Sequence, residues 1–258
     1  MRALYDLNSF FTTPPIQSDQ PCNTKQLKEK NMSTNPIKLS PSDLTFLWDE
    51  CPRCFYLKYI YKIKRPAAPF PSVFGVIDRL MKAHFAGRPA SEIDPSLQPG
   101  IISVSEKWIE SVPVELPGHS MRCFLRGKVD AMISFEDGSY GVIDFKTSEP
   151  KPSQIPFYSR QLHAYAYALE HAAPGRLNLK PISRLGLLVE APHATLNATT
   201  EEINFHFIST WLEIPYYEDG FLHFIDQVLQ LLELPEPPLA SENCAYCQYR
   251  QHAREHGM

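Results

Sequence analysis

The chain is 258 residues long, carries a formal net charge of −4 and is 43% hydrophobic, which is the composition of a globular protein and excludes a largely disordered one. No apolar run reaches the roughly 18 residues needed to cross a membrane. The N-terminus also lacks the charged-then-apolar order of a secretion signal. We therefore expect a cytoplasmic protein without membrane contact. The negative charge argues against nucleic-acid binding through bulk electrostatics but leaves open a local basic groove.

The chain divides by composition into three parts. Residues 1–37 are polar, with scattered prolines and no hydrophobic period, and predict a flexible leader in which Met32 is a second candidate start. Residues 38–234 are expected to form the principal domain. A stiff proline-rich linker begins at Leu234 and leads into residues 235–258. This C-terminal element carries a Cys-x-x-Cys pair and is expected to pack back on residues 44–60.

Two helices are expected in the first third of the domain. Ser40 has the character of an N-cap, followed by proline at the first helical position and an acid at the third. Apolar residues then recur at helical spacing from Leu44 to Phe55. A second helix is expected over Ser72–Phe85. Asp78 lies there inside an apolar line and needs a metal, a partner or an opening to solvent, because burying an unpaired charge is costly.

The segment Arg53–Arg65 mixes five basic residues with four aromatic ones. This mixture suits contact with a single-stranded nucleic acid, since cations follow the backbone and rings stack on bases. The alternative is an amphipathic helix end whose lysines are merely solvated. The sequence leaves both interpretations open.

Strand-forming residues surround an Asp137-Gly138 turn. Met121–Phe135 is the expected outgoing strand and Tyr140–Thr147 the returning one. The elements that follow are expected to be a helix, two strands and a second helix, over Ser159–Ala172, Leu185–Val189, Ile203–Ile208 and Glu218–Leu234.

The candidate chemistry lies in this hairpin. Asp144 and Lys146 are two residues apart on the returning strand, so their side chains point to one face. With Asp130 on the outgoing strand, two carboxylates would form a hard oxygen site for Mg²⁺ or Mn²⁺. Such an ion binds a phosphate oxygen and lowers the pKa of a bound water. A neighbouring lysine positions that water or stabilises developing charge.

The length of the hairpin loop decides whether the two aspartates meet. A four-residue loop, Glu136–Ser139, places Asp130 opposite Phe145 and puts the aspartates on opposite faces, because a one-residue slip reverses the face. An odd loop or a bulge brings them to one face. One example is a three-residue loop, Asp137–Ser139, which would place Asp130 opposite Lys146.

Four of the six cysteines form two Cys-x-x-Cys pairs. In a cytoplasmic chain this spacing indicates a four-thiolate metal site and not disulfides. Tetrahedral Zn²⁺ and a 4Fe–4S cluster both accept four thiolates, and either would staple the first helix to the C-terminus. The alternative is two unconnected pairs of buried thiols. The paired residues are Cys51, Cys54, Cys244 and Cys247, whereas Cys22 and Cys123 have no partner at useful spacing.

Taken together, Gly127-Lys128-Val129-Asp130, followed fourteen residues after the aspartate by Asp144-Phe145-Lys146, resembles the PD-(D/E)xK nucleases of the RecB and CRISPR-adaptation-nuclease branch. The resemblance extends over roughly residues 39–247 and implies an α/β fold. This fold is a restriction-endonuclease-like core with a small mixed central sheet, the acidic hairpin at its centre and helices on both faces. The resemblance also implies metal-dependent hydrolysis of DNA, with preference for single strands or frayed ends.

The same resemblance implies roles for residues outside the hairpin. Gln161 and Tyr165, one helical turn apart on the expected helix, would orient the lysine or contact the substrate. The branch carries a metal-binding histidine three residues after a glycine, and here Asp78 follows Gly75 at that spacing. Asp78 or the nearby His84 would then be the third metal ligand.

For the cysteines, the resemblance favours a 4Fe–4S cluster over Zn²⁺. Iron–sulfur members of the branch carry one cysteine ahead of the core and three behind it. The last of those positions is Ala253 here, so Cys54 would supply the missing ligand. Protein partners in a repair or CRISPR-type complex are implied in the same way.

Two other classes of function are weighed against a nuclease. The first is a catalytically silent module that holds nucleic acid or forms a protein complex with the same fold, since fold does not determine function. The second is a zinc-stapled structural protein, which would leave the acidic hairpin unexplained. The sequence has no Gly-x-Ser-x-Gly elbow and no phosphate-binding glycine loop, so neither serine-hydrolase chemistry nor an ATP site is expected.

Overall fold

The computed structural model describes residue 11 and residues 35–67, 69, 71–104, 106–198 and 202–257. The expected leader lies outside the described residues apart from Phe11 and residues 35–37, and Cys22 and Met32 lie outside them as well. Phe11 is buried, with its ring centroid 5.3 Å from that of His163 and 6.2 Å from that of Phe224. This residue of the expected leader is therefore part of the core.

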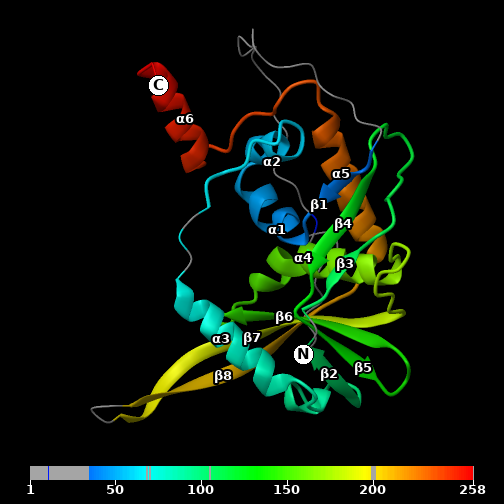
Figure 1. Ribbon diagram of the computed structural model, residues 1–258, viewed down its shortest axis with the longest axis vertical. Helices are drawn as coiled ribbons and strands as arrows, with labels where there is room; N and C mark the ends of the chain where they lie inside the picture. The colour runs from blue at the N-terminus through cyan, green and yellow to red at the C-terminus, as the bar shows by residue number, and fades with distance from the viewer. Residues whose placement is uncertain are drawn as a thin grey trace.

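A five-stranded mixed sheet forms the centre of the molecule (Figure 1). Neighbouring strands are antiparallel except for the central pair, β6 and β7, which is parallel. Residues 141–145 of β6 are buried. The expected α/β fold, a small mixed sheet with the acidic hairpin at its centre, is confirmed. The strand order is β2 (Gly100–Val104), β5 (Ala131–Phe135), β6 (Tyr140–Thr147), β7 (Ile182–Ala198) and β8 (Ile203–Ile214).

Helices cover both faces of this sheet, as expected. On one face Phe85 of α3 (Ser72–Phe85) packs in a cluster with Phe145 of β6. On the other face α4 (Gln154–Glu170) and α5 (Glu218–Glu233) share a core with the inward residues of β6 and β7. α4 also provides the crossover that a parallel strand pair requires. None of the described helices is long and apolar enough to cross a membrane.

A second, three-stranded sheet has the order β1 (Ile37–Leu39), β4 (Cys123–Lys128), β3 (Trp108–Glu110). The expectation of one strand over Met121–Phe135 is therefore wrong, because β4 and β5 belong to different sheets. Packing decides the break. The backbone at Gly127 lies so close to Pro41 and Tyr165 that a Cβ there would come within 2.9 Å of each. This contact ties β4 to the helices, while β5 runs in the larger sheet.

The apolar period over residues 44–55 belongs to two helices, α1 (Pro41–Glu50) and α2 (Pro52–Tyr59), and not to one. Cys51 between them has an extended backbone, with φ −166° and ψ 111°. Pro52 is the reason, because proline has no N–H to donate and disfavours the helical conformation of the residue before it. Cys51 thereby becomes the N-cap of α2.

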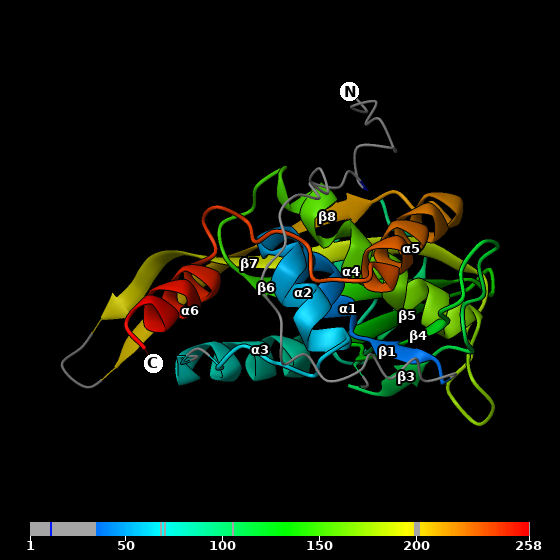
Figure 2. The same cartoon turned by 90° about the horizontal axis from the view of Figure 1, so that it is seen from above.

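β7 and β8 are far longer than the sequence predicts. They pair from Leu185 with Ile214 to Ala198 with Ile203, and they extend past the other strands as a two-stranded arm (Figures 1 and 2). Apolar residues of the arm such as Phe205 are exposed. The buried apolar run that predicted a strand over Leu185–Val189 therefore ends where the arm leaves the core. β2, β3 and the C-terminal helix α6 (Ala245–Glu255) are likewise absent from the sequence-based expectation.

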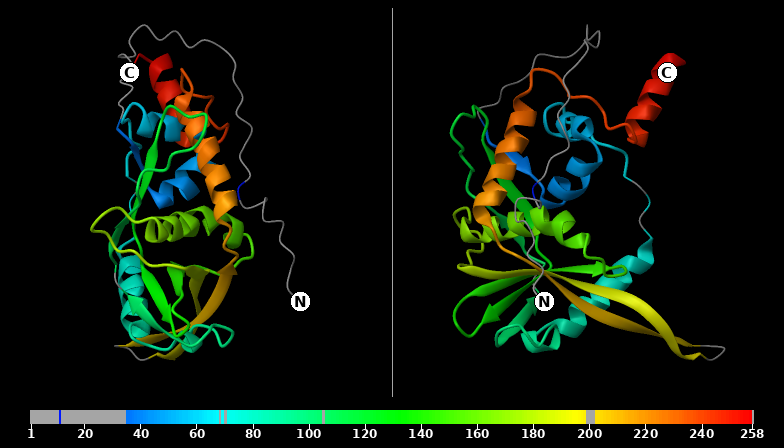
Figure 3. Two further views of the ribbon diagram at one scale, coloured as in Figure 1. Left: turned by 90° about the vertical axis from the view of Figure 1, so that its right-hand side faces the viewer. Right: turned by 180° about the vertical axis from the view of Figure 1, so that it is seen from behind.

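Figure 3 shows α1, α2, α5 and α6 gathered at one end of the molecule, with the five-stranded sheet and α3 at the other. α4 lies between the two groups and contacts α1, α5, β6 and β7. Its buried residues therefore face either the sheet or the helical end.

His163 of α4 faces the helical end. Its Nδ1–H donates to the carbonyl oxygen of Ser159 at 2.8 Å, and its Nε2 accepts from the N–H of Tyr217 at 2.9 Å. Burial lowers the pKa of His163 from 6.5 to about 4. Between these two pKa values the ring is neutral in the folded protein but protonated in the unfolded chain. The contribution of His163 to the free energy of unfolding is therefore fully present above pH 6.5 and is lost as the pH falls towards about 4.

We expect His163→Gln to flatten the dependence of stability on acid. A glutamine amide can donate to Ser159 and accept from Tyr217, but it does not titrate. Between pH 7 and pH 5 the wild type should lose about 2 kcal/mol more unfolding free energy than this variant. Urea unfolding at the two pH values measures the difference. The exposed His223→Gln on α5 is the control, and equal acid sensitivity of all three proteins would contradict the assignment.

Candidate functional site

The β5–β6 hairpin brings Asp130 and Asp144 together. Ser134 pairs with Tyr140 and Ala131 pairs with Ile143, and the N–H of Phe135 donates to the carbonyl oxygen of Ser139 at 3.0 Å, so the loop is the three residues Glu136–Gly138. The loop is odd, and extending the register by one pair places Asp130 opposite Asp144. The register thus meets the condition derived from the sequence, although the loop lies one residue earlier than the three-residue example, so Asp130 lies opposite Asp144 and not Lys146.

Asp144 is buried in the centre of the sheet. Burial is the main cause that raises its pKa to about 6; the charge of Lys146 opposes this rise and the carboxylate of Asp130 adds to it. Asp144 Oδ1 accepts a hydrogen bond of 3.1 Å from Nε2 of Gln161. Asp144 Oδ2 forms an ion pair with Lys146 but accepts no hydrogen bond. A buried carboxylate whose pKa is raised in part by a neighbouring carboxylate is a site for a cation.

Lys146 is held by Asp144 on one side and by an aromatic ring on the other. Its Nζ lies 4.5 Å from the ring centroid of Tyr158 on α4. Burial by itself would lower the pKa of Lys146, but the charge and contact of Asp144 more than offset it, so the net pKa is raised. The side chain is therefore a fixed positive charge, suited to stabilising an anion and not to accepting a proton.

Lys82 of α3 is a member of the site that sequence reasoning missed. Its Nζ lies 2.8 Å from Asp130, 2.9 Å from Asp78 and 3.0 Å from Glu106. Burial alone would lower the pKa of Lys82, but the hydrogen bonds to Asp130 and Asp78 raise it. The available signal was the spacing of Asp78 and Lys82, four residues apart on one helix. Asp78 therefore reaches Asp130 only through a lysine, while His84 is exposed at the edge of the Phe85 ring.

Gln161 and Tyr165 lie on the face of α4 that is turned to the hairpin. Gln161 Nε2 lies 3.1 Å from the hydroxyl oxygen of Tyr165, in addition to its bond with Asp144. Gln161 Oε1 is buried without a hydrogen-bond partner. The ring of Tyr165 fills the space beside Gly127. Gln161 thus connects α4 to β6 through its hydrogen bond with Asp144, and Tyr165 connects α4 to β4 through packing against Gly127.

The oxygen atoms present suit a divalent cation. Asp130 and Asp144 provide carboxylates, and the buried Gln161 Oε1 has no hydrogen-bond partner. Magnesium and manganese prefer such oxygen ligands. Lys82 Nζ lies between two of the expected ligands, 2.9 Å from Asp78 and 2.8 Å from Asp130, whereas one group in the described part of the chain, four cysteines, is arranged to hold a metal. Asp78 as a third ligand would therefore require Lys82 to move.

That group consists of the two Cys-x-x-Cys pairs. Its sulfur atoms all lie within 4.8 Å of one another. Individual separations are 3.9 Å between Cys51 and Cys247, 3.7 Å between Cys54 and Cys244, and 3.6 Å between Cys54 and Cys247. Cys51 is the N-cap of α2 and Cys244 is the N-cap of α6, so each pair occupies the first turn of its helix. Four cysteines gathered in this way can bind a metal.

Cys123 is separate from this group. It is buried in β4, where burial raises the pKa of its thiol to about 12. A buried thiol with a raised pKa stays protonated, so Cys123 is an unreactive packing residue.

The aromatic residues of the basic segment Arg53–Arg65 are mostly unavailable for stacking. Phe55, Tyr56 and Tyr59 are buried in the core. Their helical spacing is that of an amphipathic helix, which is the second of the two interpretations left open by the sequence. The C-terminal part of the segment lies outside α2 and is exposed enough to contact a ligand.

Comparison with known proteins gives a family match. The model of the PD-(D/E)XK nuclease superfamily matches residues 98–252, which is more than half of the 258 residues. Among solved structures, one described as "Crystal structure of SSO0001" is 18% identical with a TM-score of 0.46, covering 88% of this chain and 87% of that chain. A structural similarity with a TM-score below 0.5 is too weak to support a family assignment, so the assignment rests on the match to the family model. No curated protein matches the chain.

We expect Lys82→Met to couple stability to divalent metal. Removing the lysine leaves Asp78, Glu106 and Asp130 without their shared cation, which should lower the melting temperature of the metal-free protein. The same uncompensated charge should make Mn²⁺ stabilise the variant more than it stabilises the wild type.

Thermal unfolding with EDTA and with Mn²⁺ measures both effects. Lys128→Met is the matched control, because Lys128 also contacts Glu106, at 2.9 Å, but lies on the surface. A Lys82→Met protein that Mn²⁺ stabilises no more than wild type would contradict a cation site at Asp130.

Proposed function

Because the chain belongs to the PD-(D/E)XK nuclease superfamily, we propose that it is a metal-dependent nuclease that hydrolyses the phosphodiester bonds of DNA. The meeting of Asp130 and Asp144 across the hairpin, with Lys146 beside Asp144, carries the proposal. Two carboxylates and a lysine are the groups that this chemistry needs. The superfamily implies a nucleic-acid substrate, and DNA is part of the proposal.

Each residue has a separate role in the proposed mechanism. Asp130 and Asp144 would hold Mg²⁺ or Mn²⁺, which when bound supplies a Lewis acid and lowers the pKa of a water. Lys146 keeps its proton, so it orients the attacking water and balances negative charge on the phosphate. Gln161 holds Asp144 Oδ1 and leaves Oδ2 to face the cation and the lysine. Tyr165 keeps Gln161 in place.

Aromatic side chains beside Lys146 support a preference for single strands or frayed ends. The Phe46 ring on α1 is 42% exposed and lies 5.3 Å from the Phe157 ring and 5.8 Å from the Tyr158 ring. Tyr158 in turn contacts Lys146. Exposed rings stack on unpaired bases, whereas the bases of a duplex are already stacked on one another. A strand entering the site would therefore meet this group first.

One observation favours a second function, the catalytically silent module. Lys82 already neutralises part of the acidic charge at Asp130. A site whose cation is a lysine needs no metal to be stable, and such a fold could hold nucleic acid without cutting it. Dependence of cleavage on metal and on Asp144 separates the two functions.

For the four cysteines we propose a single Zn²⁺ ion in preference to a 4Fe–4S cluster. Four Zn–S bonds of about 2.3 Å directed to the corners of a tetrahedron hold the sulfurs about 3.8 Å apart. The three separations of 3.6 to 3.9 Å agree with that value. In a 4Fe–4S cluster each cysteine binds a different iron, so the sulfurs must lie further apart. The arrangement of two cysteines ahead of the core and two behind also suits zinc.

The proposed zinc ion would hold α6 in place. α6 has no buried residues, so its own packing provides little reason to dock against the rest of the molecule. Cys244 and Cys247 join it to Cys51 and Cys54 at the start of α2. Binding of the metal would then contribute directly to folding of this end of the chain.

We expect metal-dependent cleavage by the wild type and none by Asp144→Asn. The exchange preserves the shape of the side chain and removes the charge that binds metal. Lys146→Met should retain stabilisation by Mn²⁺ but lose cleavage by on the order of 10²-fold, because only the charge on the lysine is removed. End-labelled single- and double-stranded DNA with Mg²⁺, Mn²⁺ or EDTA provides the assay.

Lys151→Met, an exposed lysine in the loop after β6, is the control and should cleave as the wild type does. A wild type that binds DNA but cuts none of it in either metal would sink the nuclease and favour the silent module.

We expect the purified protein to be colourless and to contain zinc in equal amount to the chain, with neither iron nor sulfide. Cys247→Ser should lose the metal and melt at a lower temperature, while Cys123→Ser should keep it. Elemental analysis of protein purified without oxygen, together with thermal unfolding, makes both measurements. Iron with inorganic sulfide and a brown colour in the wild type would overturn the proposed zinc ion.

A further inference from the structure

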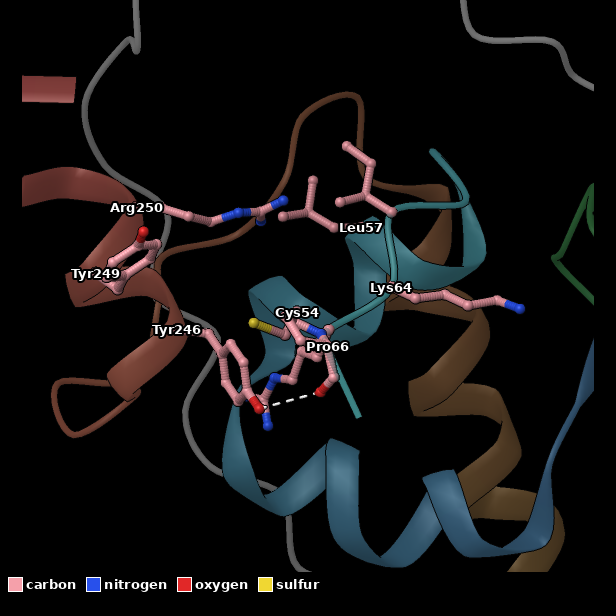
Figure 4. A pocket seen from close by; sticks show the side chains of 9 residues that line it. Cys54, Leu57, Lys64, Pro66, Tyr246, Tyr249 and Arg250 are labelled. Atoms are coloured by element: carbon pink, nitrogen blue, oxygen red, sulfur yellow. Dashed lines mark hydrogen bonds between the residues drawn. The ribbon is translucent and has the colours of Figure 1, made fainter. Parts of the chain in front are cut away.

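A small pocket lies beside the four cysteines, between α2, the segment that follows it and α6 (Figure 4). Its volume is about 240 Å³. Leu57 and Ile63 provide an apolar lining, and Arg65 and Arg250 provide positive charge, whereas the side chain of Lys64, which also lines the pocket, points away from α6 (Figure 4). Pockets for drug-sized ligands begin at roughly 300 Å³. This pocket therefore has room for one base or one phosphate, but not for a base pair.

The charge around the pocket is of one sign. No acidic residue lines it, in a protein whose net charge is −4. Lys64 and Arg250 form no ion pair within 4 Å with any residue that the structure describes. Arg65 is already positioned: it pairs with Glu50, donates to Cys244 Sγ at 3.3 Å and lies 4.8 Å from the Tyr246 ring. Its Nε is nevertheless buried without a hydrogen-bond partner.

Two tyrosines of α6 add stacking surfaces to these cations. Tyr246, Tyr249 and Arg250 are spaced three and four residues apart, so they share one face of the helix. Tyr246 donates from its hydroxyl to the carbonyl oxygen of Pro66 at 3.1 Å, which fixes the mouth of the pocket (Figure 4). The Tyr249 ring is 73% exposed. An exposed ring next to unpaired cations is the combination that binds unpaired nucleotides.

α1 connects this pocket to the acidic hairpin. Glu50 at the end of α1 contacts Arg65 of the pocket. Phe46 lies one turn earlier, about 6 Å along the helix axis, and contacts Tyr158 beside Lys146. A strand running from the hairpin past Phe46 would therefore arrive at Arg65 by following the surface of α1.

We propose that this pocket binds the phosphate of one nucleotide of a single-stranded DNA substrate, beside Arg65 and Arg250, while the base of that nucleotide stacks on the exposed Tyr249 at the rim. The inference rests on the proposed nuclease function, for which it names a second point of substrate contact. The Arg65 guanidinium, held by Glu50 and the Tyr246 ring, is a fixed positive charge at which a phosphate can bind. The occupant is part of a strand and not a free nucleotide, because the pocket lies on the surface path from the hairpin.

The test measures binding of a fluorescently labelled oligothymidylate by anisotropy, in the Asp144→Asn background with Ca²⁺ so that no strand is cut. Arg250→Glu and Tyr249→Ala should each weaken binding by about tenfold, and Arg250→Glu should reduce the salt dependence of log K by about one phosphate contact. Arg254→Glu, the same charge change on an exposed part of α6 outside the pocket, should weaken binding by less than twofold.

Each alternative outcome overturns a different statement. Equal weakening by Arg250→Glu and Arg254→Glu would show a general charge effect and remove the pocket as a site. Competition by thymidine monophosphate as strong as competition by unlabelled strand would assign the pocket to a free nucleotide and overturn the strand proposal. If the wild type cuts DNA while Arg250→Glu and Tyr249→Ala bind normally, the nuclease stands and the pocket proposal fails. If the wild type cuts nothing while both variants lose binding, the pocket stands without the nuclease.

Discussion

Two carboxylates, Asp130 and Asp144, approach each other across a hairpin in the middle of a buried sheet, and the remaining charges of the site are arranged around that repulsion. Lys82 arrives from α3 to balance Asp130, and Lys146 balances Asp144 from its own strand. Each lysine is buried enough that the loss of its acidic partner would leave an uncompensated charge, which is far more costly than the ion pair is favourable. The acids and the lysines therefore stabilise each other, and the position of α3 relative to the hairpin must be maintained for these ion pairs to form.

α4 connects the acidic site to the rest of the core, because its two sides contact different parts of the molecule. Gln161 and Tyr165, four residues apart, lie against the hairpin and hold Asp144. His163, two residues from Gln161, points to the other side and is held by the backbone of Ser159 and Tyr217. The orientation of Gln161 towards the acid is therefore determined in part by a buried histidine that touches nothing in the site.

The helical end of the molecule has a different physical basis. α6 buries none of its residues, and the cysteine pairs at the first turns of α2 and α6 are what join it to the domain. The same junction positions Arg65, which contacts Cys244, Glu50 and Tyr246 at once. The group of four cysteines, the basic pocket and the end of α1 are in this way built from neighbouring residues. They form a local positive surface on a protein of net charge −4.

The sequence by itself determined the features that depend only on residue type and short-range spacing. Asp144 and Lys146 share a face because strands have a period of two, and Gln161 and Tyr165 share a face because helices have a period of 3.6. The mixed α/β fold was implied by the resemblance of these residues to the PD-(D/E)xK nucleases. The loop length, by contrast, was open, because a four-residue loop and an odd loop are both compatible with an Asp-Gly turn, and only the register of the folded hairpin brings the aspartates together.

Tertiary structure alone decided the features that depend on residues far apart in the chain. The break between β4 and β5 follows from packing of Gly127 against Pro41 and Tyr165, which no local pattern reveals. Lys82 enters the site because α3 packs on one face of the sheet and brings this side chain to Asp130. The cysteine spacing allowed a cluster or a single ion, and the sulfur separations that distinguish them exist only once α2 and α6 meet. Local periods are properties of the backbone and can be read from sequence, whereas the distances between elements are set by the packing of the whole chain.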